Sequence, residues 1–366
     1  MHLACACLLS LAVEQASGAA EGVRVQGPGV APHLIFACCD QGVTRMVSLF
    51  SDPQVSSELK DLHAGIAIAI SDFRPERRDL VRSMNQAGIP VIAWLMLSRE
   101  QGTYFNAGNE QLAATRFAAF DAWSHEQGLR WQGVGLDIEP NFAELSALKG
   151  HWWRLSSTLL RRSFDGRRLV RAQQSYSELI GAIRARGYWI QTFQMPFVPL
   201  EREAHSTLLD RMLGTVDVSG DQDVVMLYSS FARPFGPGMI WTVGPESQAI
   251  SVGVTDGGPG KEAAPLNWEE FSRDLILAGR FSRTVGVYNL EGCVHQGFLL
   301  RLESFDWNQS VFIPADALLR ARILHRTLGY VLWIASHLQI PAAIILLVII
   351  TMVWWRRHNK RRKEIC

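Results

Sequence analysis

The sequence feature that most constrains the fold is a regular alternation of short apolar runs with longer amphipathic stretches. Eight of the runs are strand-like: Leu34–Cys39, Gly65–Ser71, Val91–Leu97, Gly133–Glu139, Trp189–Phe197, Val224–Ser229, Ile250–Thr255 and Val285–Leu290. Continuous apolar runs of this kind are typical of parallel strands covered on both faces. They predict an α/β fold, a closed (β/α)8 TIM barrel over residues 31–307. The alternative is a doubly wound open sheet, but its Gly-rich first turn is missing.

Most gaps between these runs have the spacing of a helix that is apolar on one side. Five stretches predict helices: Pro75–Ala87, Asn109–Gln127, Leu155–Arg186 (as one or two helices), Arg202–Leu213 and Trp268–Arg280. Pro75 stands in a first turn, where its missing N–H costs nothing. The Gly- and Pro-rich stretch Ala232–Ser247 predicts a loop.

The C-terminal segment predicts a membrane anchor. Leu332–Trp355 is apolar and uncharged, and a helix that spans a bilayer needs ~20 such residues. Its last two residues are Trp, which suits the interfacial aromatic belt, and residues 356–366 form a basic tail of formal net charge +5. Residues 308–331 are then expected to be a connector. We therefore expect a single-pass protein of the cell membrane with an extracytoplasmic barrel and a cytoplasmic C-terminus.

The N-terminus has some features of a signal peptide. Leu3–Val13 is an apolar core followed by small residues, which predicts a possible signal peptide over residues 1–20. The usual positive start is missing, since no Lys or Arg precedes Arg24. Charge asymmetry at the C-terminus therefore has to set the expected topology.

Composition and motifs exclude several classes of function. The formal net charge is +1 and there is no basic stripe, so we expect no nucleic-acid partner. The sequence holds no phosphate-binding loop, serine-hydrolase elbow or metal-ligand spacing, so neither a nucleotide, a metal nor another cofactor is expected. Six cysteines are too few for a disulfide scaffold of this length. One bridge, from Cys293 to Cys38 or Cys39, is expected to staple the neighbouring first and eighth strands.

The fourth strand ends in two carboxylates, Asp137 and Glu139. Side chains alternate along a strand, so these two share one face with Gly135 while the apolar Leu136 and Ile138 face the helices. In a barrel, function collects at the C-terminal ends of the strands. Two carboxyl groups so close cannot both ionise freely, and the raised pKa of one suits a general acid. From the residues alone, a pair that binds solvent or caps the next helix is equally acceptable.

The stretch Gly133–Pro140 (GVGLDIEP) resembles the end of the D-G-x-D-x-D-x-E signature of glycoside hydrolase family 18, the chitinase-like barrels. Met226 and Tyr228 on the sixth strand match that family's Met-x-Tyr. Tyr288 and Glu291, around the eighth strand, stand where the family usually has Trp and Asp. The resemblance covers roughly Leu34 to Gly292.

This resemblance implies a glycosidase that uses the N-acetyl group of its own substrate, an exception to the scheme with two enzyme carboxylates. With the expected C-terminal anchor, the enzyme would be membrane-anchored. Glu139 would be the general acid, and Asp137 would orient the acetamido group that attacks in place of an enzyme nucleophile. Tyr228 would donate a hydrogen bond to that group, and Tyr288 would form the floor of a sugar subsite. The substrate would be a polysaccharide that contains N-acetylhexosamine.

The sequence also departs from the family. Gln132 and Gly135 stand where the family has its first two Asp residues, so the usual partner of Asp137 is missing. The L-D-x-E pattern is also similar to that of family 25 lysozymes, which makes peptidoglycan-type glycans an equally acceptable substrate. The departures favour an alternative in which the barrel binds sugar with impaired catalysis.

Further residues are weaker candidates for sugar binding. Aromatic faces suit the apolar faces of sugars, so Trp94, Tyr104 and Trp241 are candidate stacking platforms. Gln194, near the end of the fifth strand, could bond a sugar hydroxyl. Asp256, after the seventh strand, would be the nucleophile of a second alternative, a glycosidase that uses Glu139 and Asp256 as its two carboxylates.

Overall fold

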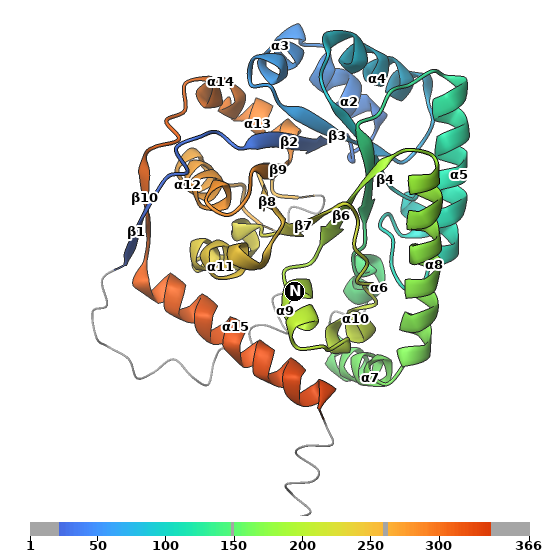
Figure 1. The fold of residues 1–366 in the computed structure, drawn as a ribbon, viewed down its shortest axis with the longest axis vertical. Coiled ribbons are helices and arrows are strands. Elements are labelled where there is room, and N and C mark those ends of the chain that lie inside the picture. The colour runs from blue at the N-terminus through green and yellow to red at the C-terminus, as the bar shows by residue number, and fades with distance from the viewer. Residues whose placement is uncertain (1–21, 148–149, 259–262, 338–366) are drawn as a thin grey trace, which may run out of the picture.

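The computed structural model describes residues 22–147, 150–258 and 263–337 (Figure 1). The predicted signal peptide, residues 338–355 of the predicted anchor and the basic tail lie outside this part of the chain.

The centre of the molecule is a closed barrel of eight parallel strands, as the sequence predicts. The strands are β2 (His33–Cys38), β3 (Gly65–Ile70), β4 (Val91–Leu95), β5 (Gly133–Asp137), β6 (Trp189–Gln194), β7 (Gln222–Met226), β8 (Ala249–Gly253) and β9 (Thr284–Tyr288). Each strand pairs with the next along the chain, and β9 pairs with β2 to close the ring. Each of the eight predicted runs overlaps one of these strands.

The strands have two apolar faces, which explains their continuous hydrophobicity. Outward side chains such as Phe36, Ile68 and Val134 belong to the main core between barrel and helices. Inward side chains such as Ile35 and Ile92 form a smaller cluster inside the barrel. Burial on both sides is what a run without polar alternation requires.

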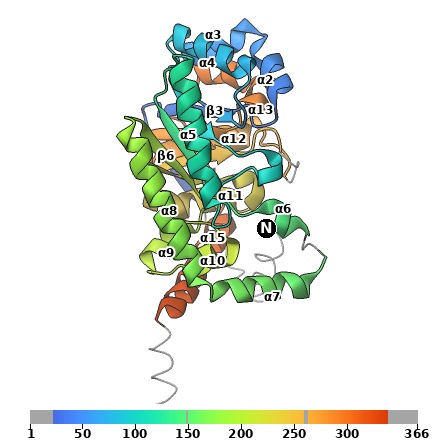
Figure 2. The ribbon, with the colours of Figure 1, turned by 90° about the vertical axis from the view of Figure 1, so that its right-hand side faces the viewer.

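Helices cover the outside of the barrel (Figures 1 and 2). They are α2 (Val43–Phe50), α3 (Pro53–Asp61), α4 (Pro75–Ala87), α5 (Glu110–Glu126), α6 (Phe142–Ala147), α7 (Trp152–Ser163), α8 (Gly166–Ala185), α9 (Val198–Glu203), α10 (Leu208–Leu213), α11 (Gly236–Val243), α12 (Trp268–Gly279), α13 (Leu290–His295), α14 (Phe298–Glu303) and α15 (Ala315–Ser336). The predicted Pro75–Ala87 helix has the bounds of α4. The predicted helices over 109–127 and 268–280 match α5 and α12 to within a residue at each end.

Two local predictions are wrong. The predicted helix Arg202–Leu213 is instead the end of α9 and a separate α10, with a break at His205, whose φ of 48° lies in the left-handed region. The predicted loop 232–247 contains helix α11. The glycines of this stretch are tolerated in a helix because they let α11 pack closely against its neighbours. A Cβ on Gly238 would collide with the backbone of Ala317 in α15.

The segment predicted as a connector is part of the folded body. Strand β10 (Ser310–Ile313) pairs with the N-terminal β1 (Val23–Gln26) in a small antiparallel sheet, and α15 follows it. Near the end of α15, Leu332 is buried against Leu200 and Ala204 of the α9 region. Within the described ranges, no helix is long and apolar enough to cross a membrane.

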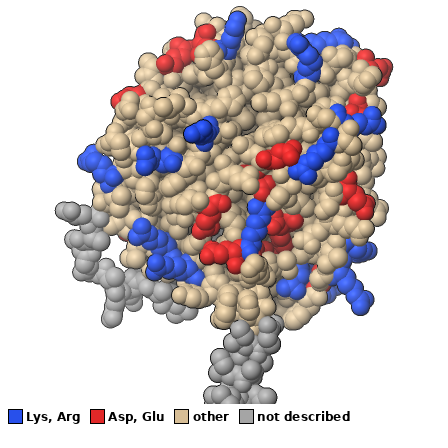
Figure 3. Space-filling model, viewed as in Figure 1, with Lys and Arg blue, Asp and Glu red and all other residues tan. Residues whose placement is uncertain are grey.

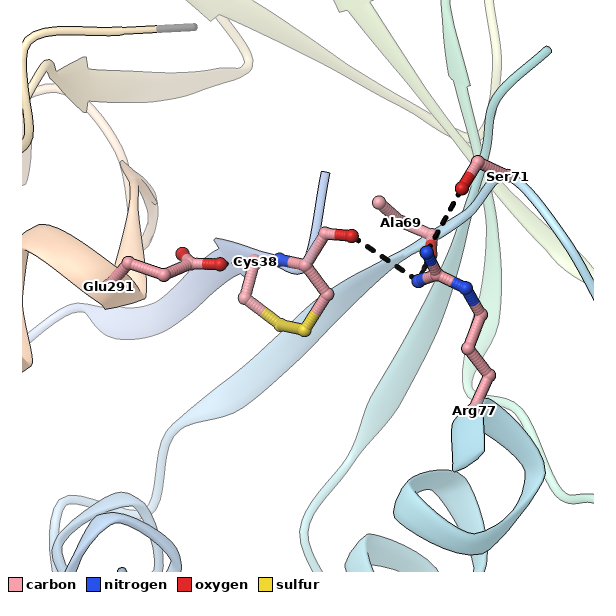
Figure 4. Close-up of a disulfide and its surroundings, with 6 residues drawn as sticks. Cys38, Ala69, Ser71, Arg77 and Glu291 are labelled. Atoms are coloured by element: carbon pink, nitrogen blue, oxygen red, sulfur yellow. Dashed lines mark hydrogen bonds between the residues drawn. A yellow bond between two sulfur atoms is a disulfide. The ribbon is translucent and has the colours of Figure 1, made fainter. Parts of the chain in front are cut away.

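The predicted bridge to Cys293 is wrong. Cys38 and the next residue, Cys39, are joined to each other, and Cys293 is a buried free thiol in the same hydrophobic cluster. Figure 4 shows this disulfide between Glu291 and Arg77. The N–H of Cys39 donates to Glu291, and the buried Arg77 guanidinium donates to the Cys39 carbonyl oxygen. The sulfur of Cys39 is already bonded to its neighbour and leaves no partner for a third thiol.

Candidate functional site

The C-terminal ends of the strands bring together most of the predicted site residues. Asp137 ends β5, and Glu139 follows it. Trp94 on β4 and Tyr288 on β9 belong to the inner cluster, and Tyr228, just after β7, packs against it. The two tyrosines, Trp94 and Asp137 therefore lie close together inside the barrel. Glu139 is partly exposed beside them.

Asp137 and Glu139 act as one titrating unit. Burial raises the pKa of Glu139, and the neighbouring Asp137 carboxylate raises it further. Burial also raises the pKa of Asp137, while hydrogen bonds from Glu139 and Trp94 oppose that rise. A carboxyl that is desolvated next to a carboxylate keeps its proton. The arrangement therefore holds a proton on Glu139 and a hydrogen-bond acceptor on Asp137.

Trp94 supplies a hydrogen bond to Asp137. The indole Nε1 donates to Asp137 Oδ2 at 3.1 Å. At Gly135, a Cβ would lie 3.0 Å from the ring of Phe193, so the space of the missing side chain is filled by an aromatic ring. Asp137 is thus held by a neutral donor. Its other oxygen, Oδ1, is buried and has no hydrogen-bond partner among the described residues.

Two tyrosines form one wall of the site. The rings of Tyr228 and Tyr288 stack with centroids 5.7 Å apart and planes 25° apart. The Tyr288 ring also meets Trp94 edge to face at 6.2 Å. Burial, followed by the nearby carboxylates, raises the pKa of both tyrosines, so both hydroxyls stay protonated donors. The wall is therefore an apolar surface edged with hydrogen-bond donors.

A second group of carboxylates lies at the ends of β2, β8 and β9, across the barrel from β5. Asp40 Oδ2 accepts a 2.6 Å hydrogen bond from the Tyr288 hydroxyl. Asp256 accepts from Gln41 at 2.5 Å and from Asn289 at 2.9 Å. Burial raises the pKa of Glu291 to about 7, and Asp40 adds to the shift. Three carboxyl groups, those of Asp40, Asp256 and Glu291, therefore gather on this side of the barrel.

Asp40 is the residue that sequence reasoning missed. Its Oδ1 is buried without a hydrogen-bond partner in the described ranges, and burial raises its pKa. The available signal was its position directly after the first strand, where barrel function collects. Two cysteines precede it, and they indicate disulfide chemistry at this position instead of a binding site.

The enclosed space below these residues is small. Its volume is about 20 Å³, room for about one water molecule, and its walls include Trp94, Asp137, Met226, Tyr228 and Tyr288. No sugar ring fits inside it in this conformation. A sugar would have to bind at the rim, where Glu139 and Tyr228 are partly exposed.

Three other predictions fare differently. Met226 lines the cavity. Gln194 is wrong as a substrate ligand because its amide donates to Thr192 and to the Val218 carbonyl, on the opposite side of β6 from Phe193. Trp241 lies on α11 and packs against Phe281 among the outer helices. In the described ranges no group of three or more His, Cys, Asp or Glu is arranged to hold a metal ion.

No protein-family model matches the chain, and no curated protein matches its sequence. Among solved structures it is similar to the glycoside hydrolase domain of PgaB (BpsB) from Bordetella bronchiseptica, with 8% identity, a TM-score of 0.46, and 75% of this chain and 98% of that chain covered.

It is also similar to a D-allulose 3-epimerase from Methylomonas sp., with 9% identity, 82% and 100% of the two chains covered, and a TM-score of 0.39. A mutant tryptophan synthase α-subunit from Pyrococcus furiosus is 12% identical over 76% and 97% of the two chains, with a TM-score of 0.38. Likenesses this distant carry no argument about activity, so the function has to be argued from the site.

Proposed function

We propose that the protein is a glycoside hydrolase that cleaves polysaccharides containing N-acetylhexosamine, with Glu139 as general acid. The observation that carries the proposal is the pair at the end of β5, in which desolvation and Asp137 raise the pKa of Glu139. A general acid needs a proton at the working pH, and this environment supplies it. The resemblance of Gly133–Pro140 to family 18 points the same way.

The unpartnered oxygen of Asp137 supports a substrate-assisted route. In this route Glu139 gives its proton to the glycosidic oxygen as the bond to the anomeric carbon breaks. The acetamido oxygen of the substrate forms the new bond to that carbon, and its N–H donates to Asp137 Oδ1. Water then attacks the anomeric carbon, gives its proton to Glu139 and releases the acetamido group, so the anomeric configuration is retained. Tyr228 provides a hydroxyl donor, and the stacked rings of Tyr228 and Tyr288 provide the surface beside the sugar.

The small cavity favours a second candidate, a barrel that binds sugar with impaired catalysis. A space of about 20 Å³ does not hold a sugar ring. Hydrolysis therefore requires the rim side chains to rearrange, whereas binding of a chain end against the partly exposed Glu139 and Tyr228 does not. Binding without turnover distinguishes this candidate from the first.

We also propose that the protein works at the outer face of a cell membrane, held by its C-terminal segment. The support is the apolar sequence of residues 338–355 and the basic tail that follows it. This location would give the barrel access to extracytoplasmic glycans.

The test is hydrolysis of N-acetylated and non-acetylated glycans by three amide variants of the full chain. Glu139→Gln keeps shape but removes the proton, so turnover should fall by ~10²–10⁴-fold. Asp137→Asn should also impair turnover because the acetamido N–H loses its acceptor. Asp256→Asn is the matched control and should matter little, since its carboxylate is engaged by Gln41 and Asn289.

The opposite pattern identifies the alternatives. If Asp256→Asn abolishes turnover and non-acetylated glycans are cleaved, the two-carboxylate mechanism holds instead. If the wild-type chain binds glycans but hydrolyses them only at the background rate, and no variant changes that rate, the protein is a sugar-binding barrel.

A further inference from the structure

Helix α7 exposes an apolar face that nothing in the described chain covers. None of its residues is buried. Its half-buried side, which includes Leu155 and Leu159, packs on α10, and Arg162 pairs with Glu144 of α6. Trp153, Leu160 and Phe164 are spaced seven and four residues apart, so they lie along one line on the opposite side. Their exposed fractions are 70%, 62% and 80%.

A second exposed apolar surface lies at the end of α15. It consists of Tyr330, Val331, Trp333 and Ile334, which surround the buried Leu332. Helix α10 contacts both α7 and α15. Figures 1 and 2 place α7 and the end of α15 at the same end of the molecule, where the chain leaves the described part after His337. The two surfaces therefore lie at one end of the molecule.

The chemistry of α7 indicates what its apolar face fits. Between Trp152 and Phe164 the sequence holds three arginines and no acidic residue, and Arg154 and Arg161 lie beside the apolar line on one side of it. Trp152 stacks on Trp153 at 3.7 Å, which presents a broad aromatic surface. An amphipathic helix with tryptophans on one face and arginines beside it is typical of a helix that lies in a membrane interface.

We propose that α7 lies in the interface of a bilayer with anionic headgroups, beside the end of α15. The residues that follow α15 argue for a bilayer over a second protein, because 338–355 are apolar and uncharged. The proposal rests on the proposed membrane location and is independent of the chemistry at Glu139. Because α7 belongs to the connection that follows Glu139, contact with the bilayer would fix that connection, and the glycan would be met close to the membrane surface.

The experiment measures tryptophan emission of the full chain in nanodiscs of phosphatidylglycerol and phosphatidylcholine, with and without brominated acyl chains. The difference in emission between wild type and the double variant Trp152→Phe/Trp153→Phe is the emission of the stacked pair. Bromolipid should quench this emission. Trp307→Phe, which removes a ring near β10, is the matched control and should leave the amount of emission quenched by bromolipid unchanged. Arg154→Gln/Arg161→Gln should weaken the quenching of the pair in anionic discs and leave it unchanged in zwitterionic ones.

A third variant separates this proposal from the anchor. Trp333 is exposed at the end of α15, so Trp333→Phe should also remove a quenched share. If the quenched emission falls relative to wild type in Trp333→Phe but not in Trp152→Phe/Trp153→Phe, the anchor stands and the contact of α7 with the bilayer is overturned. If the emission of the Trp152–Trp153 pair is the same with and without brominated acyl chains, the contact of α7 is overturned too. Helix α7 would then be covered by a second copy or by water.

Discussion

At the scale of single residues, the site is governed by carboxyl groups that lose water on folding. Glu139, Asp137, Asp40 and Glu291 all have raised pKa values, and burial is the largest cause in each case. Such groups hold protons in the folded protein that they would release in the unfolded chain. The same desolvation that suits Glu139 for acid catalysis therefore makes stability depend on pH.

Glu291→Gln should make the protein less sensitive to rising pH. The folded-state pKa of Glu291 is about 7 against an ordinary 4.5, so its stabilising contribution is complete below the unfolded value and is lost as the pH rises through about 7. Glutamine does not titrate and can still accept from Cys39. The Tm of the variant relative to wild type should therefore increase from pH 5 to pH 8. Glu303→Gln, an exposed position on α14 with the same charge change, is the control, and parallel curves for all three proteins would contradict the assignment.

Trp94→Phe tests the hydrogen bond from the indole to Asp137. The ring volume largely remains, but Asp137 loses its 3.1 Å donor. We expect kcat to fall more than KM changes, because Asp137 then orients the acetamido group less well. Phe193→Leu, which alters packing beside Gly135 and leaves the hydrogen bond in place, is the comparison. Equal kcat losses in the two variants would show that packing alone is at stake.

At the scale of elements, α15 is the addition to the eight-fold repeat, and its attachment depends on the close approach of α11. A Cβ on Gly238 would collide with the backbone at Ala317. Gly238→Ala should therefore push the two helices apart and lower the Tm, with faster amide exchange across α15. Gly181→Ala on the exposed side of α8, where a Cβ meets nothing within 4 Å, should instead be neutral or stabilise by up to ~1 kcal/mol. Unchanged exchange in α15 of the Gly238 variant would show that the contact adapts.

At the scale of the whole molecule, acidic and basic side chains are interspersed over the face shown in Figure 3. The order of the barrel strands brings two groups of carboxylates to opposite sides of one mouth. The segment that follows α15 would then determine the location of this site relative to the membrane.

The full chain should stay with membranes after an alkaline carbonate wash, because its C-terminal apolar segment would span the bilayer. A chain that ends after His337 keeps α15 and should be released. Protease added outside intact cells should digest the barrel and spare the tail. Recovery of the full chain in the wash, or digestion of the tail alone, would rule out this topology.

The sequence by itself determined the eight strands and the place of Asp137 and Glu139. Both depend on local information, since continuous apolar runs identify doubly covered strands and the end of such a strand in a barrel is its functional end. The helices with strong amphipathic spacing, α4, α5 and α12, could be predicted for the same reason.

Only the tertiary structure decided the contacts between distant segments. Asp40 meets Tyr288 because β9 closes the ring against β2, and no local pattern encodes that partner. Gly- and Pro-rich residues form α11 because α15 packs on them, which overrides their low helix propensity. Gln194 and Trp241 failed as ligands because their facing depends on where a strand or helix meets its neighbours. The exposed line of Trp153, Leu160 and Phe164 on α7 likewise became visible only when the rest of the fold left it uncovered.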